Sequence, residues 1–400
     1  MTTKPGEVLL LTQEDQTAAA VRSVLDAEAP PDSASSGPSS AWRLDTADIC
    51  GSMLDLRARL SRRPMNGHPR VALVDIDRDA ERILSELSVV SLTYLHTWFI
   101  VVSKEFDERR VLHAMQAGAR HYLRKGAIAV ELDRVLEQVL AHTPQTAARL
   151  GTILSVFSCS GGCGATTAVV NLAGELRQAF AQRVLIVDLD PHYGAAATYL
   201  GVKGRYGIAH ILSREGPIDR PLIESTALSH RAGLDIVLSP ATAEADAGIS
   251  LDYRRLPPAL EACRESYEYV LLDAPRLPRP VVADLAAASQ MNVLVLQLTV
   301  RDVTFAGALV SFLAEQGISR QRILPLANRF RRRGPSVKLE EGRQALGVAA
   351  LHPIRDDWAE AVRSANRGQP LCDVAGRSRL RRDYRRLAAH IHEFITKGGA

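Results

Sequence analysis

Long apolar segments are missing from this sequence. No run of apolar residues approaches the ~20 that a membrane-spanning helix requires. The first residues, MTTKPGEVLLLT, also lack the long apolar core and the small-residue cleavage site of a signal peptide. These two absences predict a cytoplasmic protein.

Cysteine is scarce, and its spacing fits neither a disulfide framework nor a metal site. The number of cysteines is odd, and no second Cys or His pair accompanies the two that flank the glycine-rich stretch near residue 162. We therefore expect five free thiols, at Cys50, Cys159, Cys163, Cys263 and Cys372. A strong charge of one sign is lacking too, since a net charge of +4 neither requires nor excludes an acidic partner.

The chain does have an ordinary globular composition and room for more than one domain. Of its 400 residues, 46% are hydrophobic and 24% are charged. We predict a first domain over residues 1–142, a linker over residues 143–151 and a second domain over residues 152–400. Residues 29–40 are rich in Pro, Ser and Gly, which predicts a mobile loop within the first domain.

Short apolar runs alternate with helical patterns in both domains. In the first domain the runs predict strands at residues 7–11, 71–75, 98–103 and 121–125. In the second they predict strands at residues 153–160, 184–187, 234–239, 269–273, 292–296 and 323–329. Strands that alternate with helices indicate a parallel sheet covered on both faces. The predicted fold class is therefore α/β, with two doubly wound parallel-sheet domains.

A glycine-rich turn follows the first strand of the second domain. Gly161, Gly162 and Gly164 permit positive φ angles and let the backbone approach a ligand closely. Successive N–H groups there, with the N-terminus of the next helix, can form a cradle for an anion. Thr166 and Thr167 stand where a hydroxyl could bind Mg²⁺ and a phosphate. The alternative is a plain turn between a strand and a helix.

The stretch from Ser160 to Thr166 resembles the deviant P-loop of the MinD/ParA family of ATPases, whose pattern is K-G-G-x-G-K-[ST]. Ser160 replaces the family's signature lysine, and Ala165 replaces the lysine that holds the β- and γ-phosphates. Because both cations are missing, we expect weakened ATP binding and slow or absent hydrolysis. The resemblance implies that ATP is bound by Ser160, Gly161, Gly162, Cys163, Gly164, Ala165, Thr166 and Thr167.

Three strand ends carry further motifs of the same family, in the expected order: Asp188-Leu-Asp190, Asp273-Ala-Pro275 and Asn328-Arg329. The resemblance implies that Asp190 orients the attacking water and that Asn328 reads adenine. It also implies that Thr166, Asp188 and Asp273 form the Mg²⁺ site, in which Asp188 also supports the loop. Without the resemblance, these carboxylates would be solvated strand ends or helix caps.

The first domain is similar to a response-regulator receiver domain, on three features. Asp75 stands where the phosphoacceptor ends a strand, Ser103 matches the hydroxyl that ends the fourth strand, and residues 117–125 match the segment GA-x-x-Y-L-x-K. Thr12-Gln13 replaces the acidic pair that binds Mg²⁺, with Glu14-Asp15 just beyond it. Since metal-assisted phosphoryl transfer needs concentrated carboxylates, we expect a degenerate receiver that serves for docking. Alternatively, Asp75 merely caps a strand.

Two arginine-rich clusters lie near the C-terminus, at residues 329–333 and 377–386. Apolar residues recur at helical spacing through the second cluster, so we favour a terminal helix packed on the sheet with a solvated basic face. The other interpretations are contact with an anionic membrane surface, as in MinD, or with DNA, as in ParA.

A receiver-like domain followed by a MinD/ParA-like domain resembles the CpaE/TadZ family of Flp (tight adherence) pilus assembly proteins. The resemblance implies a localisation factor that binds ATP and Mg²⁺, forms a homodimer, and places the pilus secretion machinery at the cell pole or inner membrane. Contact with the membrane would be peripheral. The alternatives are a ParA-like partitioning ATPase that binds DNA, which we disfavour, and a MinD-like cytoplasmic ATPase switch.

Overall fold

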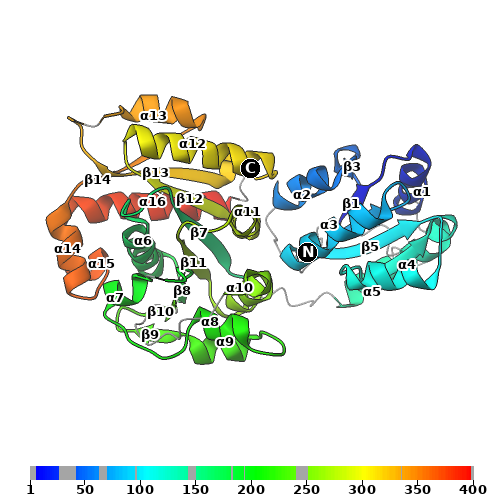
Figure 1. Cartoon of the computed structure of the whole chain (residues 1–400), viewed down its shortest axis with the longest axis horizontal. Helices are drawn as coiled ribbons and strands as arrows, with labels where there is room; N and C mark the ends of the chain where they lie inside the picture. The colour runs from blue at the N-terminus through cyan, green and yellow to red at the C-terminus, as the bar shows by residue number, and fades with distance from the viewer. Residues whose placement is uncertain are drawn as a thin grey trace, which may run out of the picture. The chain divides into compact units, whose positions relative to one another are not determined.

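The structure is a computed structural model that describes residues 6–26, 42–62, 70–94, 97–142, 150–181, 183–192, 194–239, 251–334 and 336–397. The chain divides into two compact units, residues 1–148 (unit 1) and 149–400 (unit 2) (Figure 1). The loop expected at residues 29–40 and most of the linker expected at residues 143–151 lie outside the described residues.

Unit 1 is built on a parallel sheet. Its strands, among the described residues, are β1 (Gly6–Leu11), β2 (Trp42–Arg43), β3 (Ile49–Cys50), β4 (Arg70–Asp75), β5 (Thr97–Ser103) and β6 (His121–Arg124). The strand order is β2-β1-β4-β5-β6, and β3 pairs with the end of β1. The helices are α1 (Asp15–Leu25), α2 (Met53–Arg62), α3 (Ala80–Thr93), α4 (Glu108–Gln116) and α5 (Ile128–His142).

Helices cover both faces of the unit 1 sheet, because side chains alternate along each strand. On β1, Val8 and Leu10 join the buried cluster that α1 and α5 complete. Leu9 and Leu11, which point to the opposite face, are also buried, and α2 packs near β1 there. A strand buried on both faces reads as a continuous apolar run, which is why the sequence pattern located β1, β4 and β5.

Unit 2 contains a larger sheet. Its strands in the described ranges are β7 (Thr152–Ser158), β8 (Val184–Asp188), β9 (Leu228–His230), β10 (Leu234–Val237), β11 (Tyr269–Ala274), β12 (Met291–Leu296), β13 (Ile323–Phe330) and β14 (His352–Arg355). The order is β14-β13-β12-β7-β11-β8-β10-β9. All neighbours are parallel except β10 and β9, and the sequence pattern did not predict that short antiparallel edge strand. The predicted α/β class of doubly wound parallel sheets is confirmed.

Two helix layers enclose this sheet (Figure 1). One face is covered by α6 (Ala165–Ala179) and α16 (Arg379–Thr396), which pack against each other. On the other face lie α10 (Leu256–Ser266), α11 (Arg279–Ala288) and α12 (Val300–Glu315). The remaining helices are α7 (Ala196–Leu200), α8 (Ile208–Ser213), α9 (Arg220–Thr226), α13 (Leu339–Leu346), α14 (Trp358–Asn366) and α15 (Leu371–Val374). Among the described residues, no helix is long and apolar enough to cross a bilayer.

The strand order of unit 2 places its ligand site. After β7 the chain continues to β8, which lies on one side of β7 in the sheet, whereas β12 lies on the other side of β7. Loops that run in opposite directions from adjacent parallel strands leave a crevice at the carboxyl ends of those strands. The end of β7 is followed directly by the glycine loop, so the loop lies at this crevice.

Candidate functional site

The glycine loop of unit 2 has the left-handed backbone that its composition predicts. Gly162 and Gly164 have φ angles of 73° and 97°, which side chains with a Cβ rarely adopt. A Cβ at Gly164 would lie 2.2 Å from Asn328 Nδ2. Gly164 is therefore required both by its backbone angle and by the close approach of Asn328.

Side chains from three neighbouring strand ends hold the carbonyl groups of this loop. Asn328 Nδ2 donates to Cys163 O at 2.8 Å. Arg276 Nη2 donates to Cys159 O at 3.4 Å, and Gln297 Nε2 approaches Gly162 O at 3.5 Å. Since Arg276 follows β11, Gln297 follows β12 and Asn328 lies near the end of β13, the sheet itself fixes the shape of the loop.

The N–H groups of the loop are available to a ligand. Within the described residues, those of Gly161, Gly162 and Gly164 have no hydrogen-bond acceptor. The first residues of α6 lack a side-chain cap, and the first helical N–H with a partner is that of Ala168. Unpaired N–H groups at a glycine loop and a helix N-terminus form an anion site, because both the donors and the helix dipole favour negative charge.

Ser160 points away from the place where a ligand would sit. Its side chain is buried, and its hydroxyl donates to Asp302 Oδ2 at 2.9 Å. Asp302 lies in the first turn of α12 and also accepts from the backbone N–H of Gln297 at 3.0 Å. Ser160 therefore ties the loop to α12, a contact that the sequence analysis did not foresee.

Cys163 and Ala165 turn their side chains into the protein. Both belong to the buried apolar cluster beneath α6, and Ala165 is 7% exposed. The Cys163 thiol lies 3.2 Å from Ser158 Oγ. The loop consequently offers a ligand its backbone and the hydroxyls of Thr166 and Thr167, which are half-buried.

Two carboxylates end adjacent strands beside the loop. Asp188 of β8 is the register partner of Asp273 of β11, and both are buried. Burial raises the pKa of Asp188, and the N–H groups of Asp190 and Ala196 offset part of that rise. Burial and then the charge of Asp188 raise the pKa of Asp273, against a hydrogen bond from Thr166. Paired buried carboxylates of this kind suit a cation.

Asp190 lies one residue beyond Leu189 and is half-buried. Its Oδ1 accepts the N–H of His192 at 2.9 Å, while its own N–H donates to Asp188 at 3.1 Å. The structure thus brings Asp190 together with Asp188 and Asp273 at one edge of the sheet, as the motif order predicts.

A small cavity next to the loop suits a planar base. Its volume is about 210 Å³, and its lining includes Gly164, Thr167, Asn328, Arg329 and Trp358. Arg329 has a φ of 51°, the only positive value at a non-glycine residue in the described ranges. Such strain is concentrated at ligand sites. The Arg329 guanidinium stands over the Trp358 ring, 5.7 Å from its centroid. Sequence reasoning missed Trp358, since a lone aromatic after a strand carries no recognisable pattern.

These features fit a nucleotide with Mg²⁺. The free N–H groups match phosphate oxygens, and the cavity beside Asn328 matches a base. No group of three or more His, Cys, Asp or Glu side chains among the described residues could hold a metal by itself. Mg²⁺ does not require one, since it is bound through one or two carboxylates together with substrate phosphates and water. Thr166, Asp188 and Asp273 would supply the protein's share.

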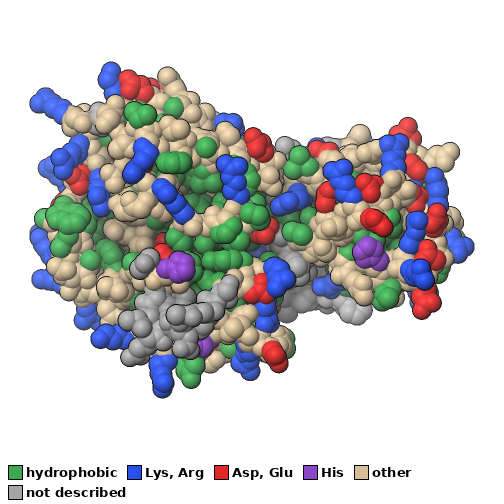
Figure 2. All heavy atoms as spheres, viewed as in Figure 1, with side chains coloured by type: hydrophobic (Ala, Val, Ile, Leu, Met, Phe, Trp, Pro, Cys, Tyr) green, Lys and Arg blue, Asp and Glu red, His purple; other side chains and the backbone are tan. Residues whose placement is uncertain are grey.

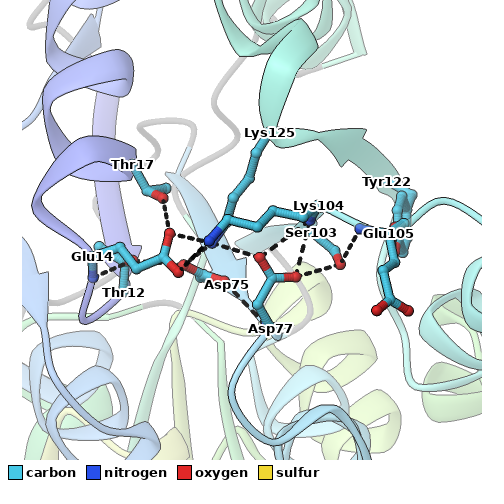
Figure 3. Close-up of polar contacts among 10 residues, drawn as sticks. All are labelled: Thr12, Glu14, Thr17, Asp75, Asp77, Ser103, Lys104, Glu105, Tyr122 and Lys125. Atoms are coloured by element: carbon cyan, nitrogen blue, oxygen red, sulfur yellow. Dashed lines mark hydrogen bonds and ion pairs between the residues drawn. The ribbon is translucent and has the colours of Figure 1, made fainter.

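Unit 1 has its own cluster of charged side chains at the carboxyl ends of β1, β4, β5 and β6 (Figure 3). Lys125 Nζ lies 2.8 Å from Asp75 Oδ2, 2.7 Å from Asp77 Oδ2 and 2.9 Å from Glu14 Oε2. Lys104 Nζ lies 2.8 Å from Glu14 Oε1. Burial lowers the pKa of Lys125, but the three carboxylates outweigh burial and raise it. The ammonium group of Lys125 therefore lies between the carboxylates of Glu14, Asp75 and Asp77.

Asp75 and Ser103 have different hydrogen-bond partners in this cluster. Asp75 accepts from Thr12 Oγ1 at 2.7 Å, whereas the Ser103 hydroxyl donates to Asp77 Oδ1 at 2.5 Å. The backbone N–H of Lys104 also donates to Asp77, at 2.9 Å. The sequence analysis had not singled out Asp77 or Lys104. The signal was the Asp75-Ile-Asp77 spacing, which places both carboxylates just past the same strand.

Comparison with known proteins agrees with the geometry of unit 2. A family model described as an AAA domain matches residues 151–315. The chromosome-partitioning ATPase Soj of Thermus thermophilus is 32% identical over 211 residues, which cover 52% of this chain and 78% of Soj.

Two solved structures share the fold. A ParA family ATPase from Chlorobium tepidum has a TM-score of 0.54 at 24% identity, over 60% of this chain and 99% of that one. MinD from Pyrococcus horikoshii, solved in complex with Mg-ADP, has a TM-score of 0.54 at 21% identity, over 62% of this chain and 98% of that one. The chain is 32% identical to Soj over most of Soj's length, and it shares the fold of these ATPases. Together with the glycine loop and its carboxylates, this shows that the chain belongs to the MinD/ParA family of ATPases.

Proposed function

We propose that unit 2 binds ATP and Mg²⁺ and hydrolyses ATP slowly or not at all. The observation that carries this proposal is the glycine loop, whose carbonyls are held by side chains from the neighbouring strands. The N–H groups of Gly161, Gly162 and Gly164 have no acceptor in the described residues. An anion can bind there without any rearrangement of the loop. Bound Mg²⁺ would neutralise phosphate charge in place of the missing lysines.

The residues that would hold the nucleotide divide into three groups. The free N–H groups of Gly161, Gly162 and Gly164 and those of the first turn of α6 would bind the phosphates, and Asn328 would bind the base. Thr166, Asp188 and Asp273 would bind the cation. Asp190 would hold the water that faces the γ-phosphate. Arg276 brings a positive charge to the loop, but through a single long contact with a backbone carbonyl.

Nucleotide binding can be tested at the base cavity. We expect a fluorescent ATP analogue to give a saturable signal with the full chain, and Trp358→Ala to weaken binding about threefold to tenfold. The reason is the loss of an aromatic surface, which is worth about 0.5–1.5 kcal/mol in stacked pairs. Tyr206→Ala is the matched control, because Tyr206 is a similarly exposed aromatic outside the cavity lining. No saturation at millimolar nucleotide would refute the proposal.

We infer that unit 1 is a receiver-like docking domain that acts without phosphorylation. Its strand order, with β1 between β2 and β4, is that of a flavodoxin-like doubly wound sheet. Lys125 already forms ion pairs with Asp75 and Asp77, and Glu14 adds a third carboxylate to the same ammonium. A divalent cation would have to displace that ammonium before a phosphate could reach Asp75.

Phosphorylation of unit 1 is therefore expected to be absent. After incubation with acetyl phosphate and Mg²⁺, the intact mass of the full chain should show no phosphate adduct. A receiver domain that is known to accept phosphate from acetyl phosphate serves as the positive control. A stoichiometric adduct that disappears in Asp75→Asn would contradict this prediction.

Unit 2 is proposed to form a homodimer across its nucleotide loops. Val300 and Phe305 lie on α12, which Ser160 ties to the loop, and they are 67% and 52% exposed. Exposed apolar side chains beside a ligand site favour a subunit contact. Because the signature lysine is absent, pairing should depend little on ATP.

Sedimentation equilibrium tests this dimer. At tens of micromolar we expect a dimer with and without ATP and Mg²⁺, and a shift toward monomer in Phe305→Asp. Ser311→Asp, an exposed position farther along α12, should leave the dimer intact. A monomeric wild type under both conditions would exclude the dimer, and a dimer seen only with ATP would show that the altered loop still acts as a switch.

We propose that the whole chain is a localisation factor for Flp (tight adherence) pilus secretion machinery at the cell pole or inner membrane. This rests on the pairing of a receiver-like unit with a MinD/ParA family unit. Cross-linking of the full chain in cells should recover inner-membrane components of that machinery. Their absence, together with even distribution of a fluorescent fusion through the cell, would contradict the proposal.

Identity to a chromosome-partitioning ATPase favours a second candidate, a partitioning ATPase that binds DNA. The exposed arginines of α16 would then contact the phosphate backbone, and such binding falls steeply with salt. A salt-sensitive mobility shift on random duplex DNA would favour this candidate over the pilus role.

A further inference from the structure

A second cavity of unit 2 is lined by arginine and lies outside the glycine loop. Its volume is about 700 Å³, and it opens between the ends of β13 and β14 and the first half of α16. Arg355 lines both this cavity and the base cavity beside the glycine loop. In Figure 2, Lys and Arg side chains gather along the margin of unit 2 where α13, α14 and β14 lie in Figure 1.

The lining of this cavity carries an excess of positive charge. Arg332, Arg355, Arg379 and Arg386 all line it, and the carboxylate among its lining residues is that of Asp383. Asp383 is already engaged by the guanidinium of Arg355, at 2.7 and 3.0 Å. In the described part of the chain, the other three arginines have no carboxylate partner. A concave surface of one charge focuses the field and attracts a counter-ion.

The spacing of these arginines suits phosphate groups. Arg379 and Arg386 are seven residues apart on α16, two helical turns along one face, and Arg332 comes from the segment after β13. Guanidinium groups bind phosphate oxygens through two parallel N–H donors. Phe330 adds an apolar ring to the lining, and the volume is that of a small-molecule site.

We propose that this cavity binds a small organic anion that carries two or more phosphate groups. A DNA duplex would bind to the exposed surface of α16, whereas a cavity lined in part by an aromatic ring suits a compact ligand. The phosphate groups can belong to a free metabolite or to the headgroup of a lipid, and both present the same chemistry to the arginines. This proposal concerns residues other than those that would hold ATP, so either can fail alone.

The experiment compares two double variants of the full chain. Arg379→Gln/Arg386→Gln removes two lining arginines, and Arg382→Gln/Arg385→Gln removes two exposed arginines of the same helix outside the lining. The full chain is titrated with inorganic pyrophosphate. Its binding site is located by comparing the hydrogen-exchange protection of β14 and α16 peptides with that of glycine-loop peptides. Vesicles of cardiolipin and phosphatidylcholine, against phosphatidylcholine alone, test the lipid source.

We expect pyrophosphate to protect the β14 and α16 peptides, with affinity at least tenfold lower in Arg379→Gln/Arg386→Gln and nearly unchanged in Arg382→Gln/Arg385→Gln. Binding of the fluorescent ATP analogue should be the same in both variants. Cardiolipin binding that pyrophosphate displaces would identify a lipid headgroup as the source. The proposal would be overturned if the two variants had equal effects, or if protection were confined to the glycine loop. It would also be overturned if both variants lost duplex DNA binding while pyrophosphate had no effect.

Discussion

Replacing Ala165 with lysine is expected to raise the rate of ATP hydrolysis by about 10²-fold over the wild type. The new ammonium would enter at the first residue of α6, beside the N–H groups that we propose bind the β- and γ-phosphates. Removal of one preorganised group that stabilises transition-state charge costs about 10²–10³ in rate, so its restoration should recover a similar factor. Phosphate release measured with saturating ATP and Mg²⁺ gives the comparison.

The control for this variant separates charge from size. Ala165 is 7% exposed and lies against the core, so a longer side chain disturbs packing whatever its charge. Ala165→Met introduces a similar length without a cation and should not raise the rate. A wild-type rate already equal to that of an ordinary family ATPase would contradict the expectation, as would an equal gain in both variants.

Ser160→Lys by itself should do much less. Asp302, which is buried and now accepts from Ser160 Oγ, lies 142 residues away in the chain but beside the new side chain. A lysine at position 160 would pair with that carboxylate first. Its contribution should therefore appear in combination with Asp302→Asn, which removes the competing charge.

Replacing Lys125 with methionine is expected to destabilise unit 1 by about 3 kcal/mol. Its side chain is 10% exposed, and it forms ion pairs with Asp75 and Asp77, whose side chains are 7% and 13% exposed. Removal of one partner from a buried ion pair leaves uncompensated charge, which typically costs about 3–5 kcal/mol. Hydrogen exchange of β4 and β6 peptides in the full chain, measured across a urea series, reports this unit separately from unit 2.

Lys104→Met is the matched control for this change. Lys104 reaches the same cluster, at Glu14, but its side chain is 63% exposed. Exposed ion pairs contribute about 0–1 kcal/mol, so the control should unfold close to the wild type. Adding Asp77→Asn to Lys125→Met removes one of the stranded charges and should recover part of the loss. Equal stability of Lys125→Met and the wild type would show that the cluster does not hold the unit together.

The cluster also sets the pH dependence of unit 1. Hydrogen bonds from Lys104 and Lys125 lower the pKa of Glu14 from 4.5 to about 2. Burial raises the pKa of Asp77, but Lys125, Ser103 and the Lys104 N–H outweigh it and lower that pKa. Both folded-state values lie below the unfolded ones, so this stabilisation is complete above about pH 4.5 and is lost as the pH falls toward 2.

Much of the fold could be predicted from the sequence, for a physical reason. Strands such as β4 and β7 are buried on both faces and are mostly apolar, so composition alone locates them. The short strands β2, β3 and β9 have two or three residues and carry too little pattern to be seen. The glycine loop and the carboxylates at the ends of β8 and β11 were found because each is visible in the local sequence, as a glycine cluster or as an aspartate that ends an apolar run.

The sequence by itself determined the α/β class, the position of the glycine loop at a strand end, and the absence of both lysines from that loop. Only the tertiary structure decided that Ser160 binds Asp302, that Asn328 holds the loop at Cys163, and that Lys125 binds Glu14. These pairs are separated by 142, 165 and 111 residues. Periodicity reports which face of an element is buried, whereas a contact between distant side chains depends on strand order and register, which assemble only when the chain folds.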